Sequence, residues 1–138
     1  MPSKRLAAFL IASALLATPA MARSSVPIVN HENVSVPSSE DKVPTAAEVK
    51  RAILAAAEAK GWLIAPQPDG KLLATFKIQN KHAIVVEISY AADQYSLTYK
   101  ESVNMKYTER DGEQLIHPNY NKWTQGLIDA IHIEMLNL

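Results

Sequence analysis

Hydrophobic residues recur at helical spacing near both ends of the folded part of this chain and at strand spacing between them. In the first segment Val49 and Ile53 lie four positions apart, with small apolar residues beside them and charged residues on the opposite face. Thr45 and Glu48 have the spacing of a capping box, and Gly61 suits the left-handed position that ends a helix. The pattern therefore predicts a helix that begins after Thr45 and ends before Gly61.

Between residues 62 and 100 the hydrophobic period changes to two, which is typical of half-buried strands. We predict strands at residues 62–65, 71–79, 82–90 and 95–100. The links between these strands are too short for parallel crossovers, so the strands are expected to be antiparallel. The side chains predicted to face inward are Leu72, Ala74, Phe76, Ile78, Ile84, Val86, Ile88, Tyr90, Tyr95, Leu97 and Tyr99.

A second apolar stripe predicts a helix over residues 119–137, with Pro118 suited to its first turn. Gly126 interrupts this helix, and we expect it to mark a close approach to the sheet. The stripe recurs at spacings of three and four residues and consists of Tyr120, Trp123, Leu127, Ile131 and Met135.

Together these elements predict an α+β fold in one domain over residues 44–138. The order helix, four antiparallel strands, helix gives a two-layer sandwich in which both helices cover one face of the sheet. The other face is expected to be open to water or to a partner. Its outward residues are Leu73, Thr75, Val85, Glu87, Ser89, Ser96 and Thr98.

Residues 1–22 have the features of a secretory signal peptide. Two basic residues precede an apolar stretch over residues 6–17, and Ala20-Met21-Ala22 supplies the small-x-small cleavage site. The stretch is shorter than the about 20 residues that span a bilayer. We therefore predict a periplasmic protein that is cleaved after Ala22 and does not span the membrane afterwards. A buried N-terminal helix is the alternative.

Residues 23–43 connect the predicted cleavage site to the domain. They contain Pro27, Pro37 and several serines, and they show no apolar periodicity. This composition predicts a flexible leader.

The composition excludes several functional classes. The 14 basic and 14 acidic residues balance, so a broad basic surface for nucleic acid is not expected. The chain has no cysteine, which rules out disulfides, thiolate chemistry, cysteine-based zinc sites and a lipid-anchored N-terminal cysteine. No cofactor is predicted.

Histidines and acidic residues form no metal-binding pattern. His117 and His132 are too far apart to share a helix turn, and His82 has no evident partner. The acidic residues after position 108 lack calcium-loop spacing and are expected to form a solvated turn around Asp111-Gly112. No metal site is predicted.

The segment from Tyr95 to Trp123 combines aromatic and polar residues in an unusual pattern. It has Ser-x-Asn-apolar-x-Tyr from position 102, and Ile-His-x-x-Tyr-Asn-x-Trp from position 116. The pattern resembles a family of small, uncharacterised exported bacterial proteins, many of them similar to lipoproteins. The resemblance spans roughly residues 61–131. The missing anchor cysteine implies a soluble periplasmic protein, and the resemblance implies no activity. The candidate site residues are Tyr99, Ser102, Asn104, Tyr107, His117, Tyr120, Asn121 and Trp123.

This aromatic and polar cluster has three interpretations. In the first, Ser102 and Asn104 bond the turning backbone between the last strand and the final helix, and His117 helps to cap that helix or bonds a buried carbonyl. In the second, the rings and polar groups line a pocket for a small ligand or peptide. In the third, Ser102, His117 and Asp111 act as nucleophile, base and orienting group of a small hydrolase, although no Gly-x-Ser-x-Gly elbow is present.

The sequence therefore predicts a non-catalytic periplasmic binding or interaction module of the bacterial cell envelope. Its partner would be an envelope protein, a peptide or a small ligand, bound through the cluster or the open sheet face. A small hydrolase that uses His117 and Ser102 is the alternative hypothesis. An inhibitor of an external enzyme also fits the size of the chain and its predicted export.

Overall fold

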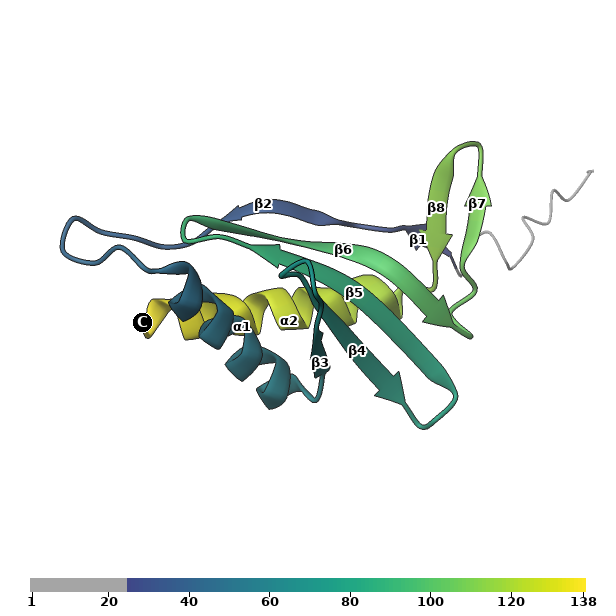
Figure 1. The fold of residues 1–138 in the computed structure, drawn as a ribbon. Coiled ribbons are helices and arrows are strands. Elements are labelled where there is room, and N and C mark those ends of the chain that lie inside the picture. The colour runs from purple at the N-terminus through teal and green to yellow at the C-terminus, as the bar shows by residue number, and fades with distance from the viewer. Residues whose placement is uncertain (1–24) are drawn as a thin grey trace, which may run out of the picture.

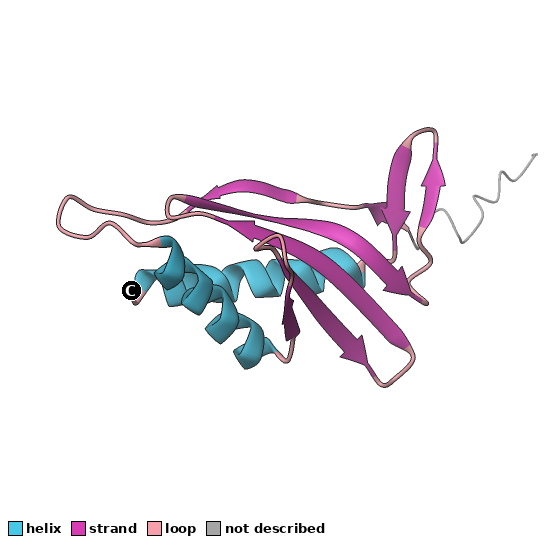
Figure 2. Cartoon of the chain, viewed as in Figure 1, coloured by secondary structure: helices cyan, strands magenta, loops and turns pink. Residues whose placement is uncertain are grey.

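The computed structural model describes residues 25–138, and the predicted signal peptide over residues 1–22 lies outside the described residues. Figures 1 and 2 show the arrangement of helices and strands. In chain order the elements are β1 (Val26–Pro27), β2 (His31–Ser35), α1 (Ala46–Lys60), β3 (Leu63–Pro66), β4 (Leu72–Ile78), β5 (His82–Tyr90), β6 (Gln94–Val103), β7 (Thr108–Arg110), β8 (Glu113–Ile116) and α2 (Asn119–Leu136). The predicted α+β class with an antiparallel sheet is confirmed.

The main sheet has five strands in the order β2-β6-β5-β4-β3, all antiparallel. The two hairpins predicted between residues 71 and 100 are present. β4 pairs with β5, as at Ala74↔Val86, and β5 pairs with β6, as at Ile88↔Leu97. The prediction of a single four-stranded sheet is wrong, because β2 adds a fifth strand beside β6 and a separate small sheet forms elsewhere.

The segment predicted to be a flexible leader forms β1 and β2, so that prediction is wrong for its described part. β2 pairs with β6 as an antiparallel strand, and side-chain hydrogen bonds add to this pairing at the sheet edge, while the sequence of β2 shows no hydrophobic alternation. The Asn33 amide donates to Ser96 Oγ at 2.9 Å, and the Tyr99 amide donates to Asn30 Oδ1 at 2.9 Å. Behind this edge, Val36 is buried in the core. Hydrophobic periodicity cannot detect a strand that docks in this way.

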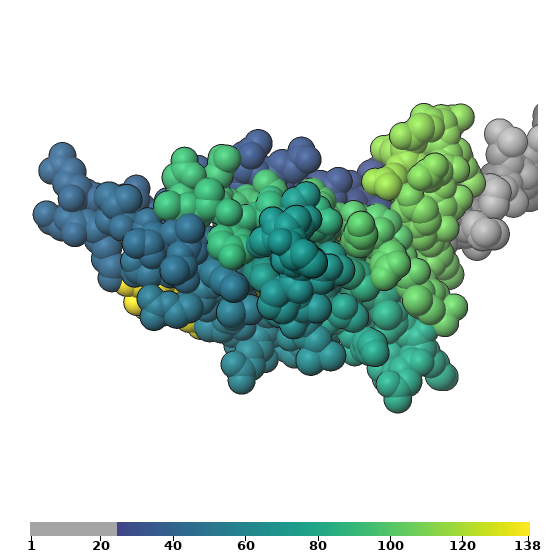
Figure 3. All heavy atoms as spheres, viewed as in Figure 1, coloured from purple at the N-terminus to yellow at the C-terminus, as the bar shows by residue number. Residues whose placement is uncertain are grey.

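A small second sheet has the order β1-β8-β7. The turn between β7 and β8 consists of Asp111 and Gly112, whose φ angles of 54° and 78° are those of a two-residue hairpin turn. The predicted turn is therefore confirmed, but its acidic flanks lie in strands, which the sequence analysis did not foresee. Figure 3 shows this hairpin projecting from the body of the molecule.

Both helices pack against the same face of the main sheet and against each other (Figure 1). The predicted start of α1 is confirmed, since Thr45 and Glu48 form a reciprocal capping box, and Gly61 ends the helix at a φ of 80°. The inward-facing strand residues that are buried are Leu72, Ala74, Ile84, Val86, Ile88, Tyr95 and Leu97, and the helices bury Val49, Ile53, Tyr120, Leu127, Ile131 and Met135 against them. The core is thus a single layer between helices and sheet.

The expectation that Gly126 marks a close approach to the sheet is wrong. A Cβ atom added at Gly126 would meet nothing within 4 Å, so the glycine leaves open space around the helix. Neither α1 nor α2, the helices of the described residues, is long and apolar enough to cross a membrane.

The face of the main sheet opposite the helices stays partly open. Its predicted outward residues are half-buried. Near the middle of this face the Glu87 carboxylate lies 3.2 Å from Lys71 Nζ and 4.0 Å from Lys100 Nζ. Ion pairs on an open surface contribute at most about 1 kcal/mol each to stability. This face is therefore a mixed surface whose ion pairs stabilise the fold only slightly.

Candidate functional site

A pocket of about 230 Å³ lies where the ends of β4 and β6 meet the start of α2. The turn between β4 and β5 supplies one wall, the turn after β6 a second, and the first helical turn of α2 a third. We call it the strand-end pocket, and it is lined by Ile78, Gln79, His82, Asn104, Met105, His117, Asn119 and Trp123. It brings together three of the eight predicted site residues, namely Asn104, His117 and Trp123.

His117 lies one residue before the N-cap of α2, and its side chain caps the helix. Its Nδ1 accepts a hydrogen bond from the Asn119 amide at 3.1 Å, while its backbone amide donates to the Met105 carbonyl at 2.9 Å. Pro118 at the N-cap position has no side chain that can bond the helix, so His117 takes over that function. The prediction that His117 helps to cap the final helix is confirmed.

Asn104 joins the two turns that form the other walls of the pocket. It adopts a left-handed φ of 56°, and its Nδ2 donates to the Lys81 carbonyl at 2.6 Å. Its own carbonyl accepts a hydrogen bond from His82 Nδ1 at 2.8 Å. In the first interpretation Asn104 bonds the turning backbone between the last strand and the final helix; its side chain instead bonds the β4–β5 turn. The result is a fixed position for the His82 ring.

Trp123 packs away from the predicted tyrosine cluster. Its ring meets Phe76 edge-on with centroids 5.5 Å apart, and Phe76 stacks on Trp62 at 5.1 Å. These three rings form an apolar wall between α2 and the sheet, with Trp123 at the pocket. The predicted cluster is therefore divided between two places.

The tyrosines form the second group. Tyr99 stacks on Tyr107 with ring centroids 4.9 Å apart and meets Tyr120 edge-on at 5.6 Å. The exposed Tyr107 hydroxyl donates to Glu109 Oε1 at 2.8 Å, and this hydrogen bond raises the pKa of the phenol above its ordinary value. Gln114 Nε2 donates to the same hydroxyl at 3.0 Å. These contacts tie the β7–β8 hairpin to the main sheet.

A bulge in β6 explains the position of Ser102. The register of the β5–β6 pair shifts between Val85 and Val86, so β6 carries one extra residue after Tyr99. The shift returns Ser102 to the same face as Tyr99, and the two hydroxyl oxygens lie 2.8 Å apart. A strand that ended at Lys100, as predicted, would not have produced this contact.

The three residues of the hydrolase hypothesis do not hydrogen-bond one another. Ser102 is paired with Tyr99, His117 Nδ1 accepts from Asn119, and Asp111 occupies the hairpin turn. A nucleophile needs a base within hydrogen-bonding reach, and this arrangement lacks that contact.

Asn121 lies outside the pocket and holds the N-terminal strands on α2. Its Nδ2 donates to the Pro27 carbonyl at 2.9 Å, and its Oδ1 accepts from the Val29 amide at 3.0 Å. Ninety-two residues of sequence separate Val29 from Asn121. Asn121, a predicted site residue, therefore has a structural role, because it joins the N-terminal segment to α2.

Sequence reasoning missed five lining residues of the strand-end pocket. The sequence shows no evident partner for His82, whose ring bonds the Asn104 carbonyl 22 positions later in the chain. In the sequence, Asn119 marks only the predicted start of a helix. The remaining missed residues are Ile78, Gln79 and Met105. They belong to strand ends and turns that meet only in the folded protein, so no local sequence pattern indicates that they line one pocket.

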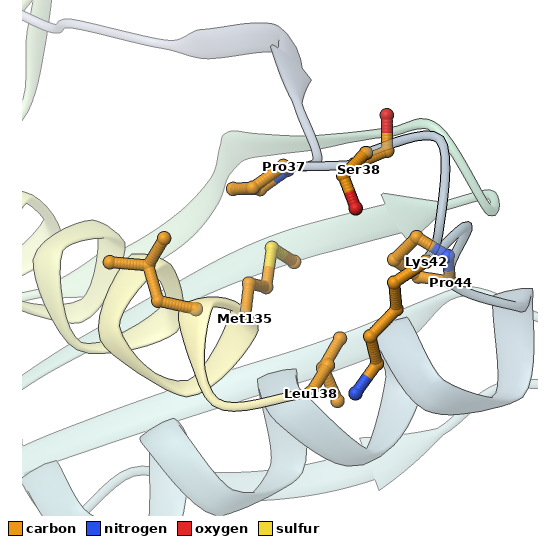
Figure 4. A pocket seen from close by; sticks show the side chains of 8 residues that line it. Pro37, Ser38, Lys42, Pro44, Met135 and Leu138 are labelled. Carbon is orange, nitrogen blue, oxygen red and sulfur yellow. The ribbon is translucent and has the colours of Figure 1, made fainter.

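Another pocket, of about 210 Å³, lies at the opposite end of α2 (Figure 4). Met135 and Leu138 form its apolar floor, and Pro37, Lys42 and Pro44 border it from the segment before α1. It contains no histidine, carboxylate or aromatic ring, so it offers less chemistry than the strand-end pocket.

Residues 25–138 contain no group of three or more histidine, cysteine, aspartate or glutamate side chains that could hold a metal ion. Comparison with protein families, curated proteins and solved structures finds no match for the chain. The resemblance to small exported bacterial proteins therefore stays a prediction.

Proposed function

We propose that this chain is an exported, non-catalytic binding module of the bacterial cell envelope, and that its ligand occupies the strand-end pocket. One observation carries the proposal. His82 begins β5, Asn104 follows β6 and His117 precedes α2, and a hydrogen bond to backbone fixes each of these side chains. Side chains that are held in place before binding lose little entropy when a ligand arrives.

The size and charge of the pocket limit what it can bind. Small-molecule sites usually enclose 300–1,000 Å³, so a pocket of about 230 Å³ accepts one group of a larger envelope component. Its lining contains no carboxylate, ammonium or guanidinium side chain. A neutral group with both polar and apolar parts fits this lining better than an ion does.

Export is part of the proposal, with cleavage after Ala22 and a periplasmic location. The basic start, the apolar stretch and the Ala-x-Ala site support it. Intact mass spectrometry of the protein recovered from a periplasmic fraction tests it. We expect a chain that starts at Arg23, and recovery of the uncleaved chain in the cytoplasm would contradict export.

A thermal-shift experiment tests the binding function. The added ligand is the low-molecular-mass fraction of a lysozyme-digested bacterial envelope. A ligand at ten times its Kd stabilises the folded state by about 1.4 kcal/mol, which raises the Tm of a domain of this size by about 5 °C. The matched variants are the double substitution His82→Asn with His117→Asn, and His132→Asn on the exposed face of α2.

We expect the fraction to stabilise the wild type and His132→Asn but not the double variant. Equal stabilisation of all three proteins would place binding outside the strand-end pocket. No stabilisation of the wild type at any concentration of the fraction would contradict the proposed function.

A further inference from the structure

The two histidines of the strand-end pocket hold opposite tautomers. His82 Nδ1 lies 2.8 Å from the Asn104 carbonyl, which can only accept, so this nitrogen carries the proton and Nε2 bears a lone pair. His117 Nδ1 accepts from the Asn119 amide at 3.1 Å, so this nitrogen has no proton and Nε2 carries it. When both rings are neutral, the pocket thus offers one imidazole acceptor and one imidazole donor.

This arrangement opposes metal binding. To bind a metal through Nε2, His117 would have to move its proton to Nδ1, and it would then lose the hydrogen bond that caps α2. His82 alone would remain as a ligand. A neutral group with its own donor and acceptor satisfies both rings without moving a proton.

The rest of the lining narrows the chemistry of that group. Besides the two histidines and Asn104, the lining combines the apolar side chains of Ile78, Met105 and Trp123 with the polar side chains of Gln79 and Asn119. An amide with a methyl group matches the first set, and hydroxyls match the second. N-acetylated amino sugars combine these features in one neutral unit.

We propose, resting on the proposed function, that the strand-end pocket binds the acetamido group of an N-acetylated amino sugar. The acetamido carbonyl accepts from His117 Nε2, its N–H donates to His82 Nε2, and its methyl group contacts Trp123. An extended peptide is the weaker candidate, because peptides add to sheet edges. The pocket is lined by strand ends, turns and the start of α2, and not by the length of a strand edge.

The experiment is a titration of the ¹⁵N-labelled purified protein followed by NMR. The probes are N-acetylglucosamine, glucose and N-acetylalanine N-methylamide, each at millimolar concentration. We expect N-acetylglucosamine to shift the Trp123 indole and both imidazole resonances in a saturable way. Glucose, which lacks the acetamido group, should bind at least tenfold more weakly.

Asparagine variants separate the contact with the ligand from the fold. Asparagine places its amide where Nδ1 lies, so His82→Asn keeps the bond to the Asn104 carbonyl and His117→Asn keeps the helix cap, while both lose Nε2. Each should weaken the binding of N-acetylglucosamine by about threefold to tenfold, the effect of one hydrogen bond. His132→Asn should bind as the wild type does.

Equal shifts with glucose and N-acetylglucosamine would overturn the proposal, as would shifts at the pocket with the peptide amide alone. Undiminished binding by both asparagine variants would also overturn it. The envelope thermal shift distinguishes the two proposals. If the envelope fraction still stabilises the wild type but not the double variant, the binding function stands and only the acetamido class is wrong.

Discussion

Replacing Tyr120 by phenylalanine should stabilise the protein, which is the opposite of what removing a buried polar group usually does. The Tyr120 side chain is 0% exposed, and its hydroxyl has no hydrogen-bond partner within the described residues. Burial also raises the pKa of this phenol well above its ordinary value, with Tyr99 adding to the effect. The hydroxyl is therefore removed from water without a hydrogen-bond partner among residues 25–138.

The magnitude follows from the cost of burying an unpaired hydroxyl, which is about 1–3 kcal/mol. Phenylalanine removes this cost and keeps the ring that meets Tyr99 edge-on at 5.6 Å. The cavity left by one oxygen atom offsets part of the gain. We therefore expect Tyr120→Phe to stabilise the fold by about 1 kcal/mol, which is a rise of about 4 °C in Tm.

Thermal melts of three variants test this reasoning. Tyr95→Phe is the parallel case, because the Tyr95 hydroxyl is also buried without a partner in the described protein and burial raises its pKa to about 12. Tyr99→Phe is the matched control, since it removes the 2.8 Å contact with Ser102 and should lower Tm by about 4 °C. A fall of that size in Tyr120→Phe would refute the reasoning, because it would mean that the hydroxyl is bonded in solution.

Three further predictions concern other parts of the fold. Burial lowers the pKa of His31 below 6.5, with Asp129 opposing the shift, so the unfolded chain takes up this proton first as the pH falls. Stability should therefore decrease below about pH 6.5, and His31→Gln should flatten that part of the curve in chemical unfolding; an unchanged slope would contradict this. Gly126→Ala should raise Tm by about 4 °C, since the added methyl group meets open space in a helix, and a lower Tm would show a hidden contact. Asn121→Ala should speed amide exchange in residues 26–35 at least tenfold through the loss of two hydrogen bonds. Unchanged exchange would contradict the structural role of Asn121.

Regular alternation made the centre of the sheet predictable. β5 begins and ends where predicted, at His82 and Tyr90, because one face of this strand is apolar and the other mixed. The capping box of α1 was equally readable, since Thr45 and Glu48 are local in sequence. Features that depend on neighbours within a few positions are open to sequence reasoning.

The N-terminal strands were not predictable in this way. β2 depends on Asn30 and Ser96, which bond backbone groups more than sixty residues away. Polar side chains in such roles look like those of a flexible segment until the fold is known. The same holds for Asn121, whose pattern suggested a site and whose bonds hold β1 and β2 in place.

The candidate site was only partly predictable. Asn104, His117 and Trp123 lie in one unusual segment, so the sequence pointed to them. The bulge in β6 and the packing of Phe76 then divided the aromatic residues between two clusters. His82 joins the pocket through a contact with a distant turn, and a contact of this kind leaves no local pattern.

The most direct test of the pocket is a long-range ¹H–¹⁵N NMR spectrum of the imidazole rings at a pH where both are neutral. The structure predicts that His82 carries its proton on Nδ1 and that His117 carries its proton on Nε2. Those two assignments would establish the opposed donor and acceptor on which the proposed ligand depends. The same tautomer in both rings, or rapid averaging between the two tautomers, would contradict the claim that the free protein holds one imidazole donor and one imidazole acceptor for a neutral amide.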